Sequence, residues 1–220
     1  CRLRERLAIL VACCRVLGKN LESKMKKIIA TAAITAALTV PVPASAQAVS
    51  LASLLQNITA ACGATATLTT CDALVAQYVA QTASLPAAER ASAIGQIVVA
   101  ATTALRTSAG ANATVAAEIQ QIVGTATTAL DTVSGADTAV NSALANVTVA
   151  VLEVVEARDL QDDAGAAATI VSALEDVADS SSDSTQADAI DDIALIIDAG
   201  GSVVDVIEEI DIVSSYASPA

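Results

Sequence analysis

The sequence predicts an all-α protein, a compact multi-helix bundle, and three observations lead to that prediction. Apolar residues recur every three or four positions through most of the chain, as on the buried face of an amphipathic helix. Glycine, proline and Ser/Asp clusters interrupt these stripes about once per helix length. Aromatic residues make up only 1% of the chain, so alanine, valine, isoleucine and leucine must form the core.

The stripes and their interruptions define the expected elements in order. Pro86 falls in a first turn, Asn112 after Gly110 is a candidate N-cap, and Ser134–Asp137 separates two helices. Later breaks fall at 162–163, 180–184 and 200–202. The expected helices span about 48–61, 71–83, 86–108, 113–133, 137–160, 164–179, 185–199 and 202–215. A strand is the alternative for the last segment, because it is rich in valine and isoleucine.

One segment of the chain resembles the segment that follows it. Residues 94–115 align with residues 119–140 at an offset of 25, thirteen of the 22 positions are identical, and Gly110 aligns with Gly135. We therefore expect an internal helix-turn repeat, made by duplication of one helix and its turn. Convergence within an Ala/Thr-rich composition is the alternative.

Residues 25–46 have the three parts of a bacterial secretory signal peptide. Two lysines follow Met25, a thirteen-residue apolar run extends from Ile28 to Val40, and Ala44–Ala46 supplies small residues for cleavage. The run is shorter than the roughly 20 residues that a membrane-spanning helix needs. We expect cleavage between Ala46 and Gln47, or after Ala48, with an uncleaved anchor as the alternative.

This interpretation divides the chain into three parts. Residues 1–24 precede Met25, the only methionine, and we expect them to be an upstream extension of the reading frame. The alternative is a lipoprotein signal ending at Cys13. Residues 47–220 then form a single exported helical domain, periplasmic or secreted, with no stable membrane span after cleavage.

The expected mature domain is strongly acidic. Residues 47–220 contain three arginines, no lysine and 22 acids, a formal charge of −19. From about residue 131 onward, Arg158 is the only basic residue among nineteen acids. Such a surface repels nucleic acid and anionic membranes, because both carry negative charge. Cations, a basic protein partner or self-association remain as partners.

Two cysteines remain after removal of residues 1–46. Cys62 and Cys71 form an isolated pair, with neither the CxxC spacing nor the histidines of a redox or metal site. In an oxidising compartment such a pair forms a disulfide. We therefore expect a structural bridge, with a redox or metal pair as the alternative.

The residues that usually carry catalysis are largely missing. The chain has no histidine, and residues 47–220 have no lysine, so the common general base and the Schiff-base nucleophile are excluded. The acid pairs at 162–163, 191–192 and 208–209 are adjacent in sequence and point to different sides of a helix. We therefore expect no catalytic residue, no cofactor and no enzyme; a carboxylate-dependent hydrolase is the alternative.

Two spacing patterns, one of aspartates and one of threonines, partly resemble known types of site. Asp179 and Asp183 have a spacing found in calcium loops, but the loop glycine and the terminal glutamate are missing, which favours an acidic linker. Thr103, Thr114 and Thr125 are eleven residues apart, as in alanine-rich ice-binding helices, but Gly110 interrupts the helix. We expect a structural or interaction module, or alternatively an acidic cell-envelope protein that binds cations or a basic partner.

Overall fold

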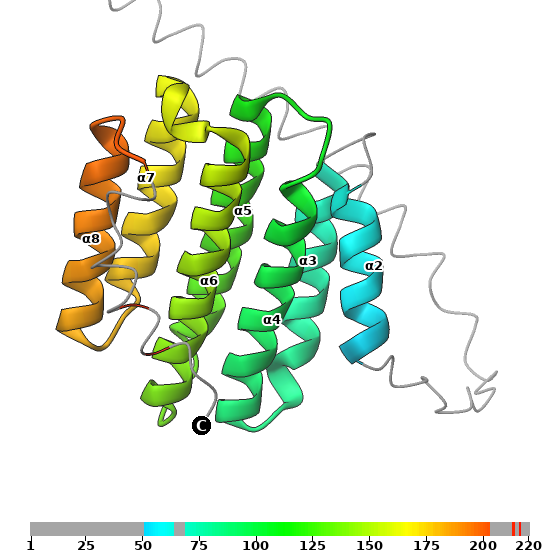
Figure 1. Ribbon diagram of the computed structural model, residues 1–220. Coiled ribbons are helices and arrows are strands. Elements are labelled where there is room, and N and C mark those ends of the chain that lie inside the picture. The colour runs from blue at the N-terminus through cyan, green and yellow to red at the C-terminus, as the bar shows by residue number, and fades with distance from the viewer. Residues whose placement is uncertain (1–50, 64–68, 203–212, 214–215, 217–220) are drawn as a thin grey trace, which may run out of the picture. The chain divides into compact units, whose positions relative to one another are not determined.

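The computed structural model describes residues 51–63, 69–202, 213 and 216, and all their regular structure is helical, which confirms the all-α prediction (Figure 1). In chain order these residues form α2 (Leu51–Gly63), α3 (Thr69–Gln81), η1 (Thr82–Ser84), α4 (Ala87–Leu105), α5 (Asn112–Leu130), α6 (Asp137–Arg158), η2 (Leu160–Asp162), α7 (Ala164–Asp179) and α8 (Ser184–Asp198). The predicted extension at 1–24, signal peptide at 25–46 and most of the segment 202–215 lie outside the described residues.

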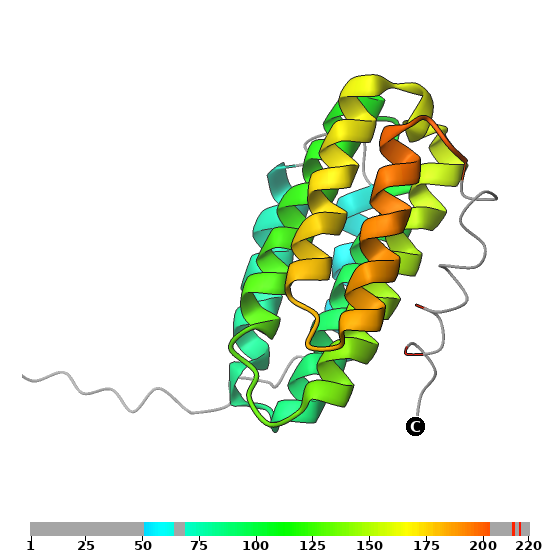
Figure 2. The same cartoon turned by 90° about the vertical axis from the view of Figure 1, so that its left-hand side faces the viewer.

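The helices are arranged in two rows that the chain visits alternately. In one row α4 packs between α2 and α6, and in the other α5 packs between α3 and α7. The last described helix, α8, packs mainly on α7, and the two lie side by side at one end of the bundle (Figures 1 and 2). Each described helix therefore has its main partners no more than two helices away along the chain, before or after it.

Helix α7 shows how the sequence stripes become the core. Ile170, Leu174 and Val177 are spaced by four and three residues, and all three are fully buried. Burying each such side chain contributes roughly 1.5–3 kcal/mol, so one face of the helix is enough to fix it to its neighbours. The opposite face of α7 carries Glu175, Asp176 and Asp179, which are exposed.

Small residues bring α4 and α6 close together. A Cβ atom built on Gly95 would lie 3.1 Å from the Cβ of Ala143 and 3.2 Å from its Cα. The two helix backbones therefore approach each other at a point where neither helix carries a bulky side chain. This contact explains how a core almost without aromatic residues reaches close packing.

Threonine can be buried in this core because its hydroxyl forms a hydrogen bond within its own helix. Thr102, Thr127 and Thr148 are buried, and each donates its hydroxyl to the carbonyl four residues earlier, at 2.9, 3.1 and 3.0 Å. A buried hydroxyl without a partner costs free energy, whereas this local bond removes that cost. The polar threonines therefore do not mark a site.

The helix ends differ in detail from the sequence prediction. Helices α4 and α5 end three residues early, because Ser108 N–H and Val133 N–H bond to carbonyls three residues back and tighten the last turn. Helix α6 ends at Arg158 because Asp159 adopts a left-handed conformation, with φ of 50°. The candidate N-cap Asn112 is wrong: Ala111 occupies the cap position and α5 begins with Asn112.

Candidate functional site

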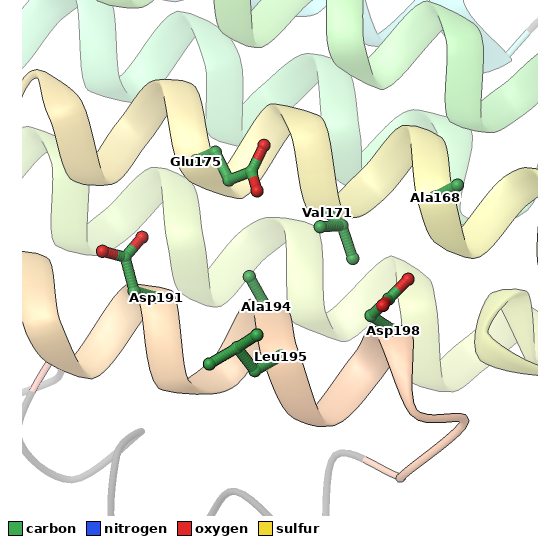
Figure 3. Close-up of a pocket in the computed structure, with 7 residues that line it drawn as sticks. All are labelled: Ala168, Val171, Glu175, Asp191, Ala194, Leu195 and Asp198. Carbon is green, nitrogen blue, oxygen red and sulfur yellow. The ribbon is translucent and has the colours of Figure 1, made fainter.

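A groove lies between α7 and α8 on the described surface. It has a volume of about 530 Å³. Helix α7 supplies one wall and α8 the other, and the side chains of Val171, Asp191 and Ala194 are directed toward the space between them (Figure 3). The lining residues are Ala168, Val171, Glu175, Asp191, Ala194, Leu195 and Asp198.

Charged and apolar residues occupy different parts of this groove. Glu175 and Asp191 lie across from each other at one end, Asp198 lies at the other end beside Ala168, and Val171, Ala194 and Leu195 lie between them (Figure 3). Asp191 and Asp198 are seven residues apart on α8, which is roughly 10.5 Å at the helical rise of about 1.5 Å per residue. The groove is thus an apolar strip with a carboxylate at each end.

Leu195 is the apolar residue that distinguishes this surface. Its exposed fraction is 67%, whereas Leu85, the other large apolar side chain exposed among the described residues, has 39%. Both neighbours of Leu195 in sequence, Ala194 and Ile196, are buried or partly buried. A single exposed leucine is common on protein surfaces, so it is the groove beside Leu195 that sets this residue apart.

The carboxylates of the groove have no cationic partner among the described residues. Burial raises the pKa of Asp191, and the nearby negative charges of Asp179, Asp188 and Asp192 raise it further. The three arginines that the described residues contain bond elsewhere: Arg90 to Thr132, Arg106 to Glu153, and Arg158 to the loop before α5. The negative potential at α7 and α8 is therefore uncompensated within the described part of the chain.

The walls of the groove are held by side-chain caps. Asp163 accepts hydrogen bonds from the backbone N–H groups of Gly165 and Ala166 at the start of α7, at 3.0 and 3.2 Å. Asp183 does the same for Thr185 and Gln186 at the start of α8, at 3.0 and 3.2 Å. An aspartate at this position typically contributes about 1 kcal/mol.

A second set of bonds ties the start of α8 to α6. Gln186, which is fully buried, donates from Nε2 to the carbonyl of Asn141 at 2.9 Å. The side chain of Asn141 in turn accepts from the N–H and the hydroxyl of Ser182, both at 3.2 Å. The turn at 180–184, which the sequence indicated as an acidic linker, is thus a fixed connection.

Arg158 fixes the opposite end of α6 to the loop between α4 and α5. Its guanidinium donates to the carbonyls of Ser108 and Gly110 at 2.7 and 2.6 Å, and to Oδ1 of Asn112 at 3.2 Å. Asn112 returns a bond from Nδ2 to the carbonyl of Arg158 at 3.2 Å. Asn112 is therefore a partner of Arg158 rather than a cap.

Glu118 on α5 performs a similar structural role for α3. Its carboxylate accepts a hydrogen bond from the N–H of Asp72 at 2.8 Å, and the side chain is 4% exposed. Burial raises its pKa, although the hydrogen bond from Asp72 N–H acts in the opposite direction. The carboxylate of Glu118, which belongs to another helix, thus accepts a hydrogen bond from a backbone N–H near the start of α3. Glu118 is therefore a structural residue.

The predicted disulfide is present. Cys62 in α2 and Cys71 in α3 are joined, with a Cα–Cα distance of 4.7 Å, and both are fully buried. The bridge closes a loop of about ten residues, which corresponds to roughly 2.7 kcal/mol in the chain-entropy model. It lies in α2 and α3, away from the groove formed by α7 and α8.

The other sequence candidates do not come together. Within the described ranges no group of three or more acids, cysteines or histidines could hold a metal ion, and this includes Asp179 and Asp183. Asp191 lines the groove but its neighbour Asp192 does not, as the helical geometry of adjacent acids predicts. Thr103 lies on α4, while Thr114 and Thr125 lie on α5, so the three do not share a helix.

A smaller hollow of about 440 Å³ lies beside Arg106, Glu153, Glu156 and Ala157. Arg106 and Glu153 form an ion pair there at 3.5 Å, with both side chains about half exposed. Such a surface pair contributes little. Arg106 offsets part of the negative charge of this hollow, whereas no cation lines the groove between α7 and α8.

Comparison with other proteins adds no assignment: the chain matches no protein-family model, no curated protein and no solved structure.

Helix α6 is long and apolar enough to cross a membrane by length and composition, but 67% of its most apolar window is buried in the bundle. Core helices of globular proteins show the same properties.

Proposed function

We propose that this protein is an exported interaction module, in which a helical scaffold presents the groove between α7 and α8 to a protein partner. The observation that carries this proposal is the exposure of Leu195 on an apolar strip whose carboxylates have no cationic partner among the described residues. Fully burying a leucine side chain contributes roughly 1.5–3 kcal/mol of stabilisation. A partner that covers Leu195 would gain part of this free energy.

The scaffold supports this proposal because each wall of the groove is held in place. Asp163 and Asp183 cap the two helices, and the bonds from Gln186 and Ser182 to Asn141 tie α8 to α6. A surface held in advance loses less conformational freedom when a partner binds.

Export and localisation are part of the same proposal. The signal-peptide pattern of residues 25–46 supports them, and so does the disulfide between Cys62 and Cys71, because such bonds persist mainly in oxidising compartments. Expression from Met25 in a Gram-negative host should give a periplasmic product that begins at Gln47, or at Val49 after the alternative cleavage. A cytoplasmic product that retains residues 25–46 would contradict export.

A photo-crosslinking residue at position 195 tests the interaction itself. In producing cells it should give discrete covalent adducts with a protein, whereas the same residue at exposed position 103 on α4 should give none. If adducts form only from positions on another face, the protein is still an interaction module, but the groove is not its binding site. If no exposed position on any helix gives an adduct, the proposal is wrong.

A further inference from the structure

We propose that the groove between α7 and α8 binds a cationic amphipathic helix whose two Lys or Arg side chains lie two turns apart and flank an apolar residue. This inference rests on the proposed function and names the chemistry of the partner. It depends on the groove lining alone: two acidic ends, an apolar middle and an exposed leucine.

The size of the groove matches one short helix. Its lining spans Ala168 to Glu175 on α7 and Asp191 to Asp198 on α8, so the first and last residues are seven positions apart on each helix, or roughly 10.5 Å. A helix laid along such a strip presents residues i and i+7 at the two ends and residues i+3 and i+4 in the middle. The apolar residue would then contact Leu195, while the two cations reach the two acidic ends.

Charge decides between this partner and the alternatives. A second copy of the chain would bring another set of carboxylates against Glu175, Asp191 and Asp198, and like charges placed together oppose binding. A divalent cation would need converging ligands, and the described residues contain no group of three or more that could hold one. A cation at Asp191 also offsets the nearby negative charges of Asp179, Asp188 and Asp192, which add to burial in raising the pKa of Asp191.

The probe is a fluorescent Leu/Ala/Lys peptide in which two lysines seven residues apart flank leucines on one helical face. Two control peptides are matched to it: one with the same composition and the lysines on the opposite face, and one with glutamate in place of lysine. Fluorescence anisotropy with the purified protein should show binding of the first peptide only, weakening as salt rises.

Two triple variants with the same change in net charge separate the groove from bulk charge. The lining triple is Glu175→Gln, Asp191→Asn and Asp198→Asn, and the control triple is Asp176→Asn, Asp188→Asn and Asp192→Asn, which are exposed on the same two helices. The lining triple should weaken binding about tenfold and the control triple about twofold or less. Leu195→Ala should also weaken binding about tenfold, and Leu85→Ala should leave it unchanged.

Peptide-induced NMR shifts in the unmodified protein give a test that needs no variant. The shifts should concentrate on α7 and α8. Equal losses in the two triples, shifts on another face, or preference for the opposite-face peptide would each overturn the groove as the site. If no lysine peptide binds but position 195 still forms crosslinks, the partner is not a cationic helix, and the protein is still an interaction module.

Discussion

Arg158 shows how much one side chain decides at the ends of this bundle. It satisfies two loop carbonyls and the side chain of Asn112, and thereby joins the end of α6 to the start of α5. The charge is partly buried, so each bond is worth more than a neutral bond on the surface. The sequence showed the only basic residue of the acidic half but not its partners, because those are two backbone carbonyls and one side-chain oxygen that lie 46 to 50 residues away.

Replacing Arg158 by Ala should therefore lower the free energy of unfolding by about 2–3 kcal/mol, because the carbonyls of Ser108 and Gly110 lose a charged donor. Urea unfolding measures this change. The matched variant Arg106→Ala removes an exposed ion pair and should cost less than about 1 kcal/mol. Equal losses in the two variants would show that Arg158 contributes only its charge.

Glu118 carries a second prediction at this scale. Burial raises its pKa above the ordinary value of 4.5, so the folded protein binds a proton there more readily than the unfolded chain. Stability linked to this group therefore increases as the pH falls from 7 through the folded pKa towards 4.5. Glu118→Gln keeps an acceptor for Asp72 N–H and should show a smaller gain, measured by urea unfolding at pH 7 and 5. An unchanged gain would contradict this assignment.

At the scale of the helix, the sequence predicted the elements well but, apart from the disulfide, did not predict which helices contact each other. The apolar stripes placed every helix between residues 69 and 198 within three residues of its observed ends, because periodicity is a local property. The groove could not be predicted this way, since it depends on which sides of α7 and α8 face each other. Asp191 and Asp192 are equivalent in sequence, yet only Asp191 lines the groove.

Two helical glycines give a paired prediction about packing. Gly95→Ala would place a Cβ 3.1 Å from the Cβ of Ala143 on α6, whose backbone-linked atoms cannot rotate away. We expect a loss of about 1–3 kcal/mol from this overpacking. Gly124→Ala meets no atom within 4 Å and should stabilise α5 by about 1 kcal/mol, because alanine favours the helix. Thermal melts measure both, and a stabilised Gly95→Ala would show that α4 and α6 can separate without cost.

At the scale of the whole molecule, burial of carboxylates and repulsion between them together set the response to pH, and the repulsion also responds to salt. Glu118 and Asp191 have raised pKa values, so mild acidification from pH 7 should increase stability, and salt at pH 7 should have a similar effect by screening. Asp183 behaves in the opposite way: hydrogen bonds from Tyr216 and the backbone N–H groups of Gln186 and Thr185 lower its pKa below the ordinary value of 3.8.

The stabilising contribution of Asp183 is complete above 3.8 and disappears as the pH falls through its folded pKa. The melting temperature should therefore rise from pH 7 to about 4.5 and fall again below 3.8. Thermal melts at low and high salt across this range test the prediction. A melting temperature that falls on acidification from pH 7 to 5 at low salt would show that paired carboxylates, and not buried or mutually repelling ones, control stability.

The alternation of the chain between two rows has a consequence for how the molecule is made. Each helix has its main partners among its two predecessors and its two successors. A chain that emerges from its N-terminal end can therefore build the bundle in the order of synthesis or translocation, with each new helix docking on a surface already formed. The main partners of each helix are close to it in sequence. Little apolar surface is therefore exposed to aggregation before the rest of the chain has been made.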